Sequence, residues 1–176
     1  TCGRYNTGGN YPAWLAKFGP TGGIIWSRRF DNGGGGGTVG MIWDVAVSQG
    51  TVYAATQVPT ASGGNGAMIG RFSASDGSLT GFTVLANGNS NTWARSISFD
   101  SSGNSFYMVG RVSGSKMLIA KYSSNMSLQW QREISSSVNV DGVSAIYNKG
   151  VLYIGGSSST SSGAILSIKL RSGNPQ

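Results

Sequence analysis

The chain has 176 residues, 29 of them glycine, with a formal charge of +7 and only 11% charged residues, against about a quarter in ordinary soluble domains. It contains no histidine, which excludes Ser-His-Asp triads, Cys-His pairs and the usual histidine-containing zinc sites. Its lone cysteine, Cys2, excludes an intrachain disulfide and is expected to be a half-buried strand residue. No apolar run approaches the length of a membrane span.

One pattern recurs along the chain. After a strand end at residues 2–6, residues 13–18 (AWLAKF) predict a strand that closes on a basic residue followed by a large apolar one. The same ending recurs at Phe72, Tyr122 and Leu170, which follow Phe18 at successive spacings of 54, 50 and 48 residues. A period near 50 predicts a repeat architecture.

Each repeat contains four apolar stretches in the same order. A turn and a second stretch follow the anchor strand, and a loop of variable composition leads to a third and a fourth stretch. The fourth stretch carries Tyr53, Tyr107 or Tyr153 at the same place. Short alternating strands separated by Gly, Asn, Asp and Ser turns predict antiparallel four-stranded sheets. Several such sheets in a row predict an all-β fold, the β-propeller, because a sandwich requires no fixed period.

The expected domain is a single β-propeller or a fragment of one, with about three full blades and a partial blade at each end. The predicted blades are residues 13–58, 67–112 and 116–158, and the partial blades are 1–12 and 163–176. The strands at residues 2–6 and 164–170 then have free edges. Because free edges recruit strands, we expect them to pair with each other or with other protein subunits.

The order of these strands and turns resembles the bacterial seven-bladed β-propeller (SBBP) repeat. The resemblance covers nearly all of the chain and is closest at residues 16–26 (AKFGPTGGIIW) and 100–110 (DSSGNSFYMVG). It implies a propeller fold and a general scaffold, because a fold shared by many functions does not specify a reaction.

The acidic residues do not form a recognisable catalytic set. A glycosidase needs two facing carboxylates, whereas Asp76 and Asp100 lie in predicted turns, where they are expected to bond their own backbone. Asp44 and Asp141 lie near the start of the third strand in two different repeats. Residues 75–80 resemble the Asp-box of sialidase propellers, which is itself a structural turn. We therefore expect no enzymatic activity, no catalytic residue, no metal and no cofactor.

Several recurring side chains are expected to pack. Trp26 and Trp130 fall eight residues after their anchors and are predicted to lie between blades. The small residues Ala16, Gly70 and Ala120 are predicted to let neighbouring sheets approach closely. The recurring basic residues are expected to cover neighbouring aromatic rings rather than to form a basic ring on one face. These residues are Lys17, Arg71, Lys121 and Lys169.

The candidate ligand or partner contacts lie beside the variable loops or form the one basic pair: Trp43, Trp93, Arg28, Arg29 and Arg95. The binding surface is expected on the loops of one face, at residues 31–42, 57–66, 86–92 and 135–142. Arg71, Arg95 and Arg111 are a possible arginine cluster that the sequence does not bring together.

The sequence favours a non-enzymatic structural or adhesive module outside the cytoplasm. This module belongs to a virion, as a capsid decoration or a tail or fibre component, or to a bacterial surface, and it makes protein or glycan contacts without membrane insertion. Two alternatives remain: a carbohydrate-active, sialidase-like enzyme, and a polyanion or nucleic-acid binder. Nucleic acid is disfavoured because the net charge alone supports it and Arg28-Arg29 is the only basic cluster.

Overall fold

The computed structural model describes residues 1–4, 13–30, 41–60, 63–86, 91–113, 116–135, 140–158 and 161–168. Every regular element in these ranges is a β-strand, which confirms the all-β prediction. The strands are β1 (Cys2–Arg4), β2 (Ala13–Phe18), β3 (Ile24–Phe30), β4 (Asp44–Ser48), β5 (Thr51–Pro59), β6 (Asn65–Ser73), β7 (Leu79–Leu85), β8 (Thr92–Phe99), β9 (Ser105–Val112), β10 (Lys116–Ser123), β11 (Leu128–Ile134), β12 (Val140–Asn148), β13 (Val151–Ser158) and β14 (Ser161–Ile168). No helix that could cross a membrane occurs in the described ranges.

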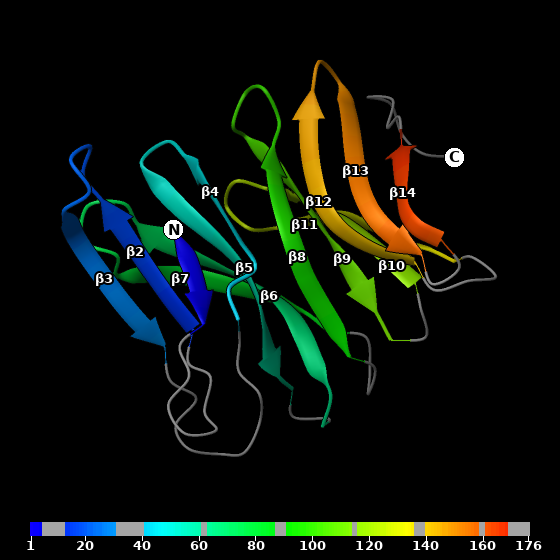
Figure 1. The fold of residues 1–176 in the computed structure, drawn as a ribbon, viewed down its shortest axis with the longest axis horizontal. Helices are drawn as coiled ribbons and strands as arrows, with labels where there is room; N and C mark the ends of the chain where they lie inside the picture. The colour runs from blue at the N-terminus through cyan, green and yellow to red at the C-terminus, as the bar shows by residue number, and fades with distance from the viewer. Residues whose placement is uncertain are drawn as a thin grey trace. The chain divides into compact units, whose positions relative to one another are not determined.

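These strands form four sheets in which chain neighbours pair (Figure 1). The sheets are β1-β2-β3 (sheet 1), β4-β5-β6-β7 (sheet 2), β8-β9-β10-β11 (sheet 3) and β12-β13-β14 (sheet 4). The registered pairs are antiparallel. The chain divides into two compact units, unit 1 (Thr1–Ala94) and unit 2 (Arg95–Gln176), and the boundary falls within β8.

Each observed four-stranded sheet begins two strands later in the chain than the blade expected from the sequence. The predicted blade 13–58 contains β2 to β5, yet β2 pairs with β1 and β3, while β4 and β5 pair with β6 and β7. The reason is the length of the links. Only residues 60–64 separate β5 from β6 in the sequence, whereas residues 31–43 separate β3 from β4. The four-stranded sheets therefore span 44–85 and 92–134, not 13–58, 67–112 or 116–158.

The ends of the described chain belong to the two three-stranded sheets. β1 pairs with β2, with Cys2 opposite Leu15, and β14 pairs with β13, with Ile168 opposite Leu152. Cys2 is a free, half-buried thiol that packs against the core of unit 1, and this burial raises its pKa. The remaining residues of the expected end strands, 5–6 and 169–170, lie outside the described ranges.

The anchors of the repeat are structurally equivalent. A β-bulge interrupts the register between Lys17 and Phe18, between Arg71 and Phe72, and between Lys121 and Tyr122. Each bulge adds one residue to the partner strand, which bends and twists the pair locally. The fourth anchor was predicted at Leu170, which lies outside the described residues. In sheet 4, Ile168 has the register of Phe72, because it faces Leu152 as Phe72 faces Val52.

Two hairpins have the turn chemistry that tight connections require. Gln49 and Gly50 join β4 to β5 with φ angles of 48° and 71°, and Lys149 and Gly150 join β12 to β13 with φ angles of 47° and 82°. Two successive positive φ angles define the type I′ turn, whose twist matches that of paired strands. The short turns predicted at these places are confirmed.

Each unit has its own core between two sheets. In unit 1, Ala13, Leu15 and Trp26 of sheet 1 pack with Val52, Ala54 and Phe72 of sheet 2, together with Ile42. In unit 2, residues of β9 and β10 pack with Leu152 and Ile154 of sheet 4. The contributing residues of sheet 3 are Tyr107, Val109, Met117 and Ile119. The alternation of side chains along each strand thus places one face of one sheet against one face of the next.

Serine side chains complete the edge of β12. The backbone N–H of Ala145 donates to Ser96 Oγ at 3.1 Å, and that of Tyr147 donates to Ser98 Oγ at 2.7 Å. An unpaired strand edge attracts foreign strands, and these two hydroxyls of β8 satisfy two N–H groups of that edge and link sheet 4 to sheet 3.

Ser96→Ala is expected to destabilise unit 2 by about 1–2 kcal/mol, because it leaves the Ala145 N–H without its acceptor at a buried site. Ser96 is only 4% exposed. Urea unfolding measures the change. Ser101→Ala, in an exposed turn of the same unit, is the control and should leave the unfolding midpoint in place. An equal effect of both substitutions would show that the Ser96 bond contributes nothing.

Candidate functional site

The recurring Trp and Lys of sheet 1 are held by a turn of sheet 2. Trp26 is buried and its Nε1–H donates to the carbonyl of Ala74 at 3.2 Å. Lys17 Nζ donates to the same carbonyl at 2.9 Å. A side chain at Gly77, whose φ is +74°, would come within 2.7 Å of the Trp26 ring. The prediction that Trp26 packs between sheets is therefore confirmed.

The other members of the basic series are held within their own sheets. Arg71 Nε donates to Thr80 Oγ1 at 3.3 Å, and Lys121 Nζ lies 5.6 Å from the centre of the Tyr107 ring. Trp130 also contacts Tyr107, with ring centres 6.1 Å apart. Lys169 lies outside the described residues. Lys121 therefore covers an aromatic neighbour as predicted, while Lys17 and Arg71 are held by hydrogen bonds.

The turn aspartates bond their own turns, as the sequence predicts. Asp76 Oδ1 accepts from the Ser78 N–H at 3.0 Å and from Ser78 Oγ at 2.8 Å. These bonds from Ser78, with one from Ser73, lower the pKa of Asp76 to about 2. Partial burial raises the pKa of Asp100, but bonds from Ser102 and nearby backbone N–H groups outweigh it and leave that pKa below its usual value. Neither carboxylate is poised to take up a proton at neutral pH.

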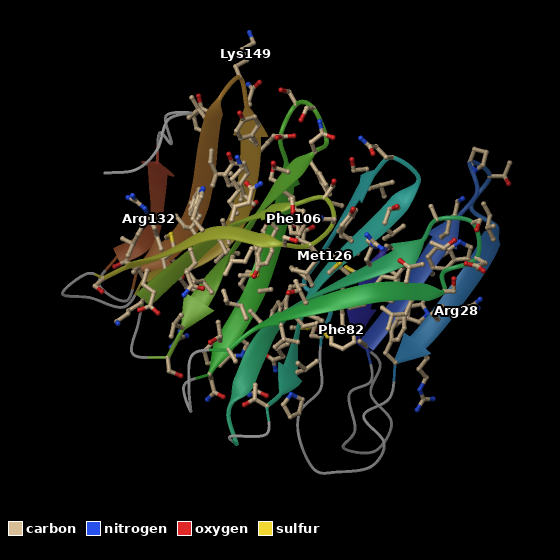
Figure 2. All side chains as sticks on the ribbon, turned by 180° about the vertical axis from the view of Figure 1, so that it is seen from behind. Arg28, Phe82, Phe106, Met126, Arg132 and Lys149 are labelled. Carbon is tan, nitrogen blue, oxygen red and sulfur yellow. The ribbon has the colours of Figure 1, made fainter. Side chains whose placement is uncertain are left out.

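Four of the five predicted contact residues lie in unit 1. Trp43 is 37% exposed, and its backbone N–H donates to the Ala55 carbonyl at 2.9 Å. Trp93 is half-buried. Arg28, labelled in Figure 2, and Arg29 are both exposed on β3. Successive residues of a strand point to opposite faces, so these two arginines do not form one basic patch. Most of the predicted binding loops lie outside the described residues, at 31–40, 61–62, 87–90 and 136–139.

The fifth residue, Arg95, belongs to a charged cluster in unit 2 (the Arg95–Arg111–Asp141 cluster). Arg95 Nη2 lies 3.6 Å from Asp141 Oδ2, and each of these side chains is 19% exposed. Burial lowers the pKa of Arg95, Asp141 raises it, and repulsion from Arg111 lowers it again. Three strands thus contribute one charge each: β8, β9 and β12.

Two glycines bring the cluster together. Gly142, next to Asp141, approaches sheet 3 so closely that a side chain there would collide with Val109 Cγ1 and come within 3.3 Å of the Gly110 carbonyl oxygen. Arg111 is the next residue of β9. Gly156, opposite Gly142 on β13, leaves room for the backbone of Asp141. Because Gly142 and Gly156 have no side chains, β12 can lie close enough to sheet 3 for Asp141 to pair with Arg95.

Sequence reasoning found one member of this cluster and missed its grouping. In the sequence, Asp141 has a place in its repeat similar to that of Asp44, and no pattern brings Arg111 next to a partner. The available signal was the Asp141-Gly142 pair, since a glycine inside a strand often marks a bulge or a close backbone approach. The register of β12 indeed shifts between Gly142 and Ser144.

Within the ranges that the structure describes, no group of three or more His, Cys, Asp or Glu residues could hold a metal ion. No protein-family model matches the chain, and no curated protein matches it. Among solved structures, the chain is similar to the tail fiber of Staphylococcus aureus phage P68, at 15% sequence identity and a TM-score of 0.36. That similarity covers 89% of this chain and 44% of the tail-fiber chain. The chain thus spans less than half the length of the tail-fiber chain.

Proposed function

We propose that the chain is a non-enzymatic β-propeller module of the SBBP repeat type, with a structural or adhesive role. It serves outside the cytoplasm, in a virion or on a bacterial surface, and makes protein–protein or glycan contacts. The low charge and the Gly- and Ser-rich composition support this location.

One observation carries the structural role: the recurring basic and aromatic side chains are used in packing. Lys17 and Trp26 share the Ala74 carbonyl of the adjacent sheet, and Trp130 packs on Tyr107. Because Lys17 and Trp26 donate to a carbonyl of the next sheet, they stabilise the packing of sheet 1 on sheet 2. A catalytic group, in contrast, needs a unique environment that tunes its pKa.

Assembly follows from the strand count of the sheets. Sheets 2 and 3 have four strands, whereas sheets 1 and 4 have three in the described ranges. Among the described residues, no strand pairs with the free side of β1 in sheet 1 or of β14 in sheet 4, where sheets 2 and 3 have a fourth strand. A strand donated to either edge would gain a full ladder of backbone hydrogen bonds, so these two edges are the proposed sites of assembly with protein subunits.

The test adds charge to one of these edges. Ile165 and Ser167 of β14 face Gly155 and Tyr153 in the register, and lysines on an edge strand oppose strand addition. We expect the wild-type chain to self-associate in sedimentation experiments and Ile165→Lys/Ser167→Lys to shift it toward monomer. The matched control is Gln129→Lys/Gln131→Lys, which places the same charge on β11, the last strand of a four-stranded sheet. A wild-type chain that is monomeric and resists proteolysis would overturn the assembly proposal.

A further inference from the structure

We propose that sheet 4 of one copy of the chain packs face to face on sheet 1 of a second copy. This inference rests on the proposed function, for which it names the partner and a contact besides the strand edges. Its basis is a feature that both units share: each core joins two sheets that are consecutive in the chain. One sheet contributes the face turned toward its successor, and the other contributes the face turned toward its predecessor.

Sheet 4 has an exposed successor face. In sheet 3 this face carries Tyr107, which is 6% exposed and stacks on Tyr147 of β12 with ring centres 5.3 Å apart. Tyr153 has the same place in the next repeat. The adjacent Leu152 packs on sheet 3, so Tyr153 points away from sheet 3, on the same side as its register partner Ile146. Tyr153 is 44% exposed and Ile146 is 63% exposed. The face that sheet 4 covers in sheet 3 is therefore open in sheet 4 itself.

Sheet 1 has an exposed predecessor face. In sheet 2 this face carries the anchor Phe72, which is 3% exposed and lies 5.2 Å from the Phe30 ring of sheet 1. The equivalent anchor of sheet 1 is Phe18. Because Leu15 packs toward sheet 2, Phe18, three residues later in the same strand, lies on the opposite face. Phe18 is 42% exposed, and its ring meets that of the half-buried Trp14 edge-on, with centres 6.4 Å apart.

The two exposed faces are the two halves of one kind of contact. A sheet that covers Tyr153 in the way seen within the units must present the face that carries an anchor aromatic. Sheet 1 of a second copy presents that face with Phe18, and burying both apolar surfaces drives the association. Such a contact is heterologous, because a face of one copy meets a different face of the next copy. It can therefore repeat from copy to copy, as a ring or as a filament.

The test places one charge on each face and follows the sedimentation of the 176-residue chain. Ile146→Glu blocks the sheet 4 face, and Phe18→Glu blocks the sheet 1 face. Each variant alone is expected to raise the dissociation constant of self-association about tenfold or more, because a carboxylate in the contact loses water without gaining a partner. An equimolar mixture is expected to regain the wild-type constant and to stop at a one-to-one complex, since one intact pair of faces remains.

The mixture is also the control for folding, because an unfolded variant cannot restore association. The matched surface control is Phe82→Glu, which should leave the dissociation constant unchanged. Phe82, labelled in Figure 2, is 61% exposed on β7 of sheet 2. An equal loss with Phe82→Glu, or no recovery in a mixture of folded variants, would overturn the proposal. A loss in Ile146→Glu with Phe18→Glu unaffected would also overturn it, since two sheet 4 faces would then meet each other.

The two substitutions separate this contact from the strand edges. Phe18 lies on β2, the middle strand of sheet 1, and Ile146 lies on β12, at the opposite side of sheet 4 from β14. Both variants therefore keep the β1 and β14 edges. Single variants that are fully monomeric yet pair on mixing would refute the edge proposal alone. Single variants that associate as tightly as the wild type would refute the face contact and leave the edges as the site of assembly.

Discussion

Phe106→Ala is expected to lower the free energy of unfolding of unit 2 by about 3–5 kcal/mol, the range for removing a buried phenylalanine ring. Phe106, labelled in Figure 2, is 0% exposed. Its ring stacks on Tyr122 with centres 5.2 Å apart and an interplanar angle of 11°, and it lies 5.4 Å from the ring of Phe99. The same environment raises the pKa of Tyr122 to about 12 through burial.

Denaturant unfolding with an unchanged slope measures this loss. The matched control is Leu128→Ala in the same sheet, because Leu128 is 46% exposed and surface truncations usually stay within about 0.5 kcal/mol. A Phe106→Ala loss no larger than that of Leu128→Ala would mean that this face of sheet 3 is open to solvent.

Gly70→Leu is expected to destabilise unit 1 by about 3 kcal/mol, near the upper end for overpacking a core. Even the first carbon of a side chain at Gly70 would lie 2.8 Å from Phe72 Cε2, with Met68 Cε at 3.5 Å. Phe72 is 3% exposed and its ring centre lies 5.2 Å from that of Phe30. The leucine must therefore displace a ring that is already confined.

The control for this substitution lies on the neighbouring strand. Gly81 faces Arg71 on β7, and no atom lies within 4 Å of where its side chain would begin. Gly81→Leu is expected to leave the thermal midpoint unchanged or to raise it slightly, since strands favour side chains over glycine. Equal losses for the two variants would show that strand propensity, and not the Phe72 ring, sets the cost.

The repeat made much of the fold predictable, because side-chain alternation and turn residues act locally. The anchors Phe18, Phe72 and Tyr122 were found from sequence, and each has its β-bulge. Gly70 was predicted to let a neighbouring sheet approach closely. The contacts differ from that prediction, since the atoms nearest to where its side chain would begin belong to Phe72 and Met68 of its own strand.

The grouping of strands into sheets could not be read from the period. A repeat of four strands has the same period whichever strand is counted first. Which strand comes first in each sheet is decided by the pairing of β5 with β6, in which Val52 faces Phe72. The charged cluster could not be predicted from the sequence for a related reason. Arg95, Arg111 and Asp141 come from three strands, and their meeting depends on how closely Gly142 approaches Val109.

The central claim is that Trp26 and Lys17 of the recurring set hold sheet 1 against sheet 2, and the indole N–H of Trp26 tests it most directly. This group donates to the Ala74 carbonyl across two sheets, and Trp43 of the same unit, 37% exposed, provides the comparison. Hydrogen exchange followed by NMR is predicted to show at least tenfold slower exchange for the Trp26 indole than for the Trp43 indole. An indole of Trp26 that exchanges as fast as a fully exposed tryptophan would contradict the claim.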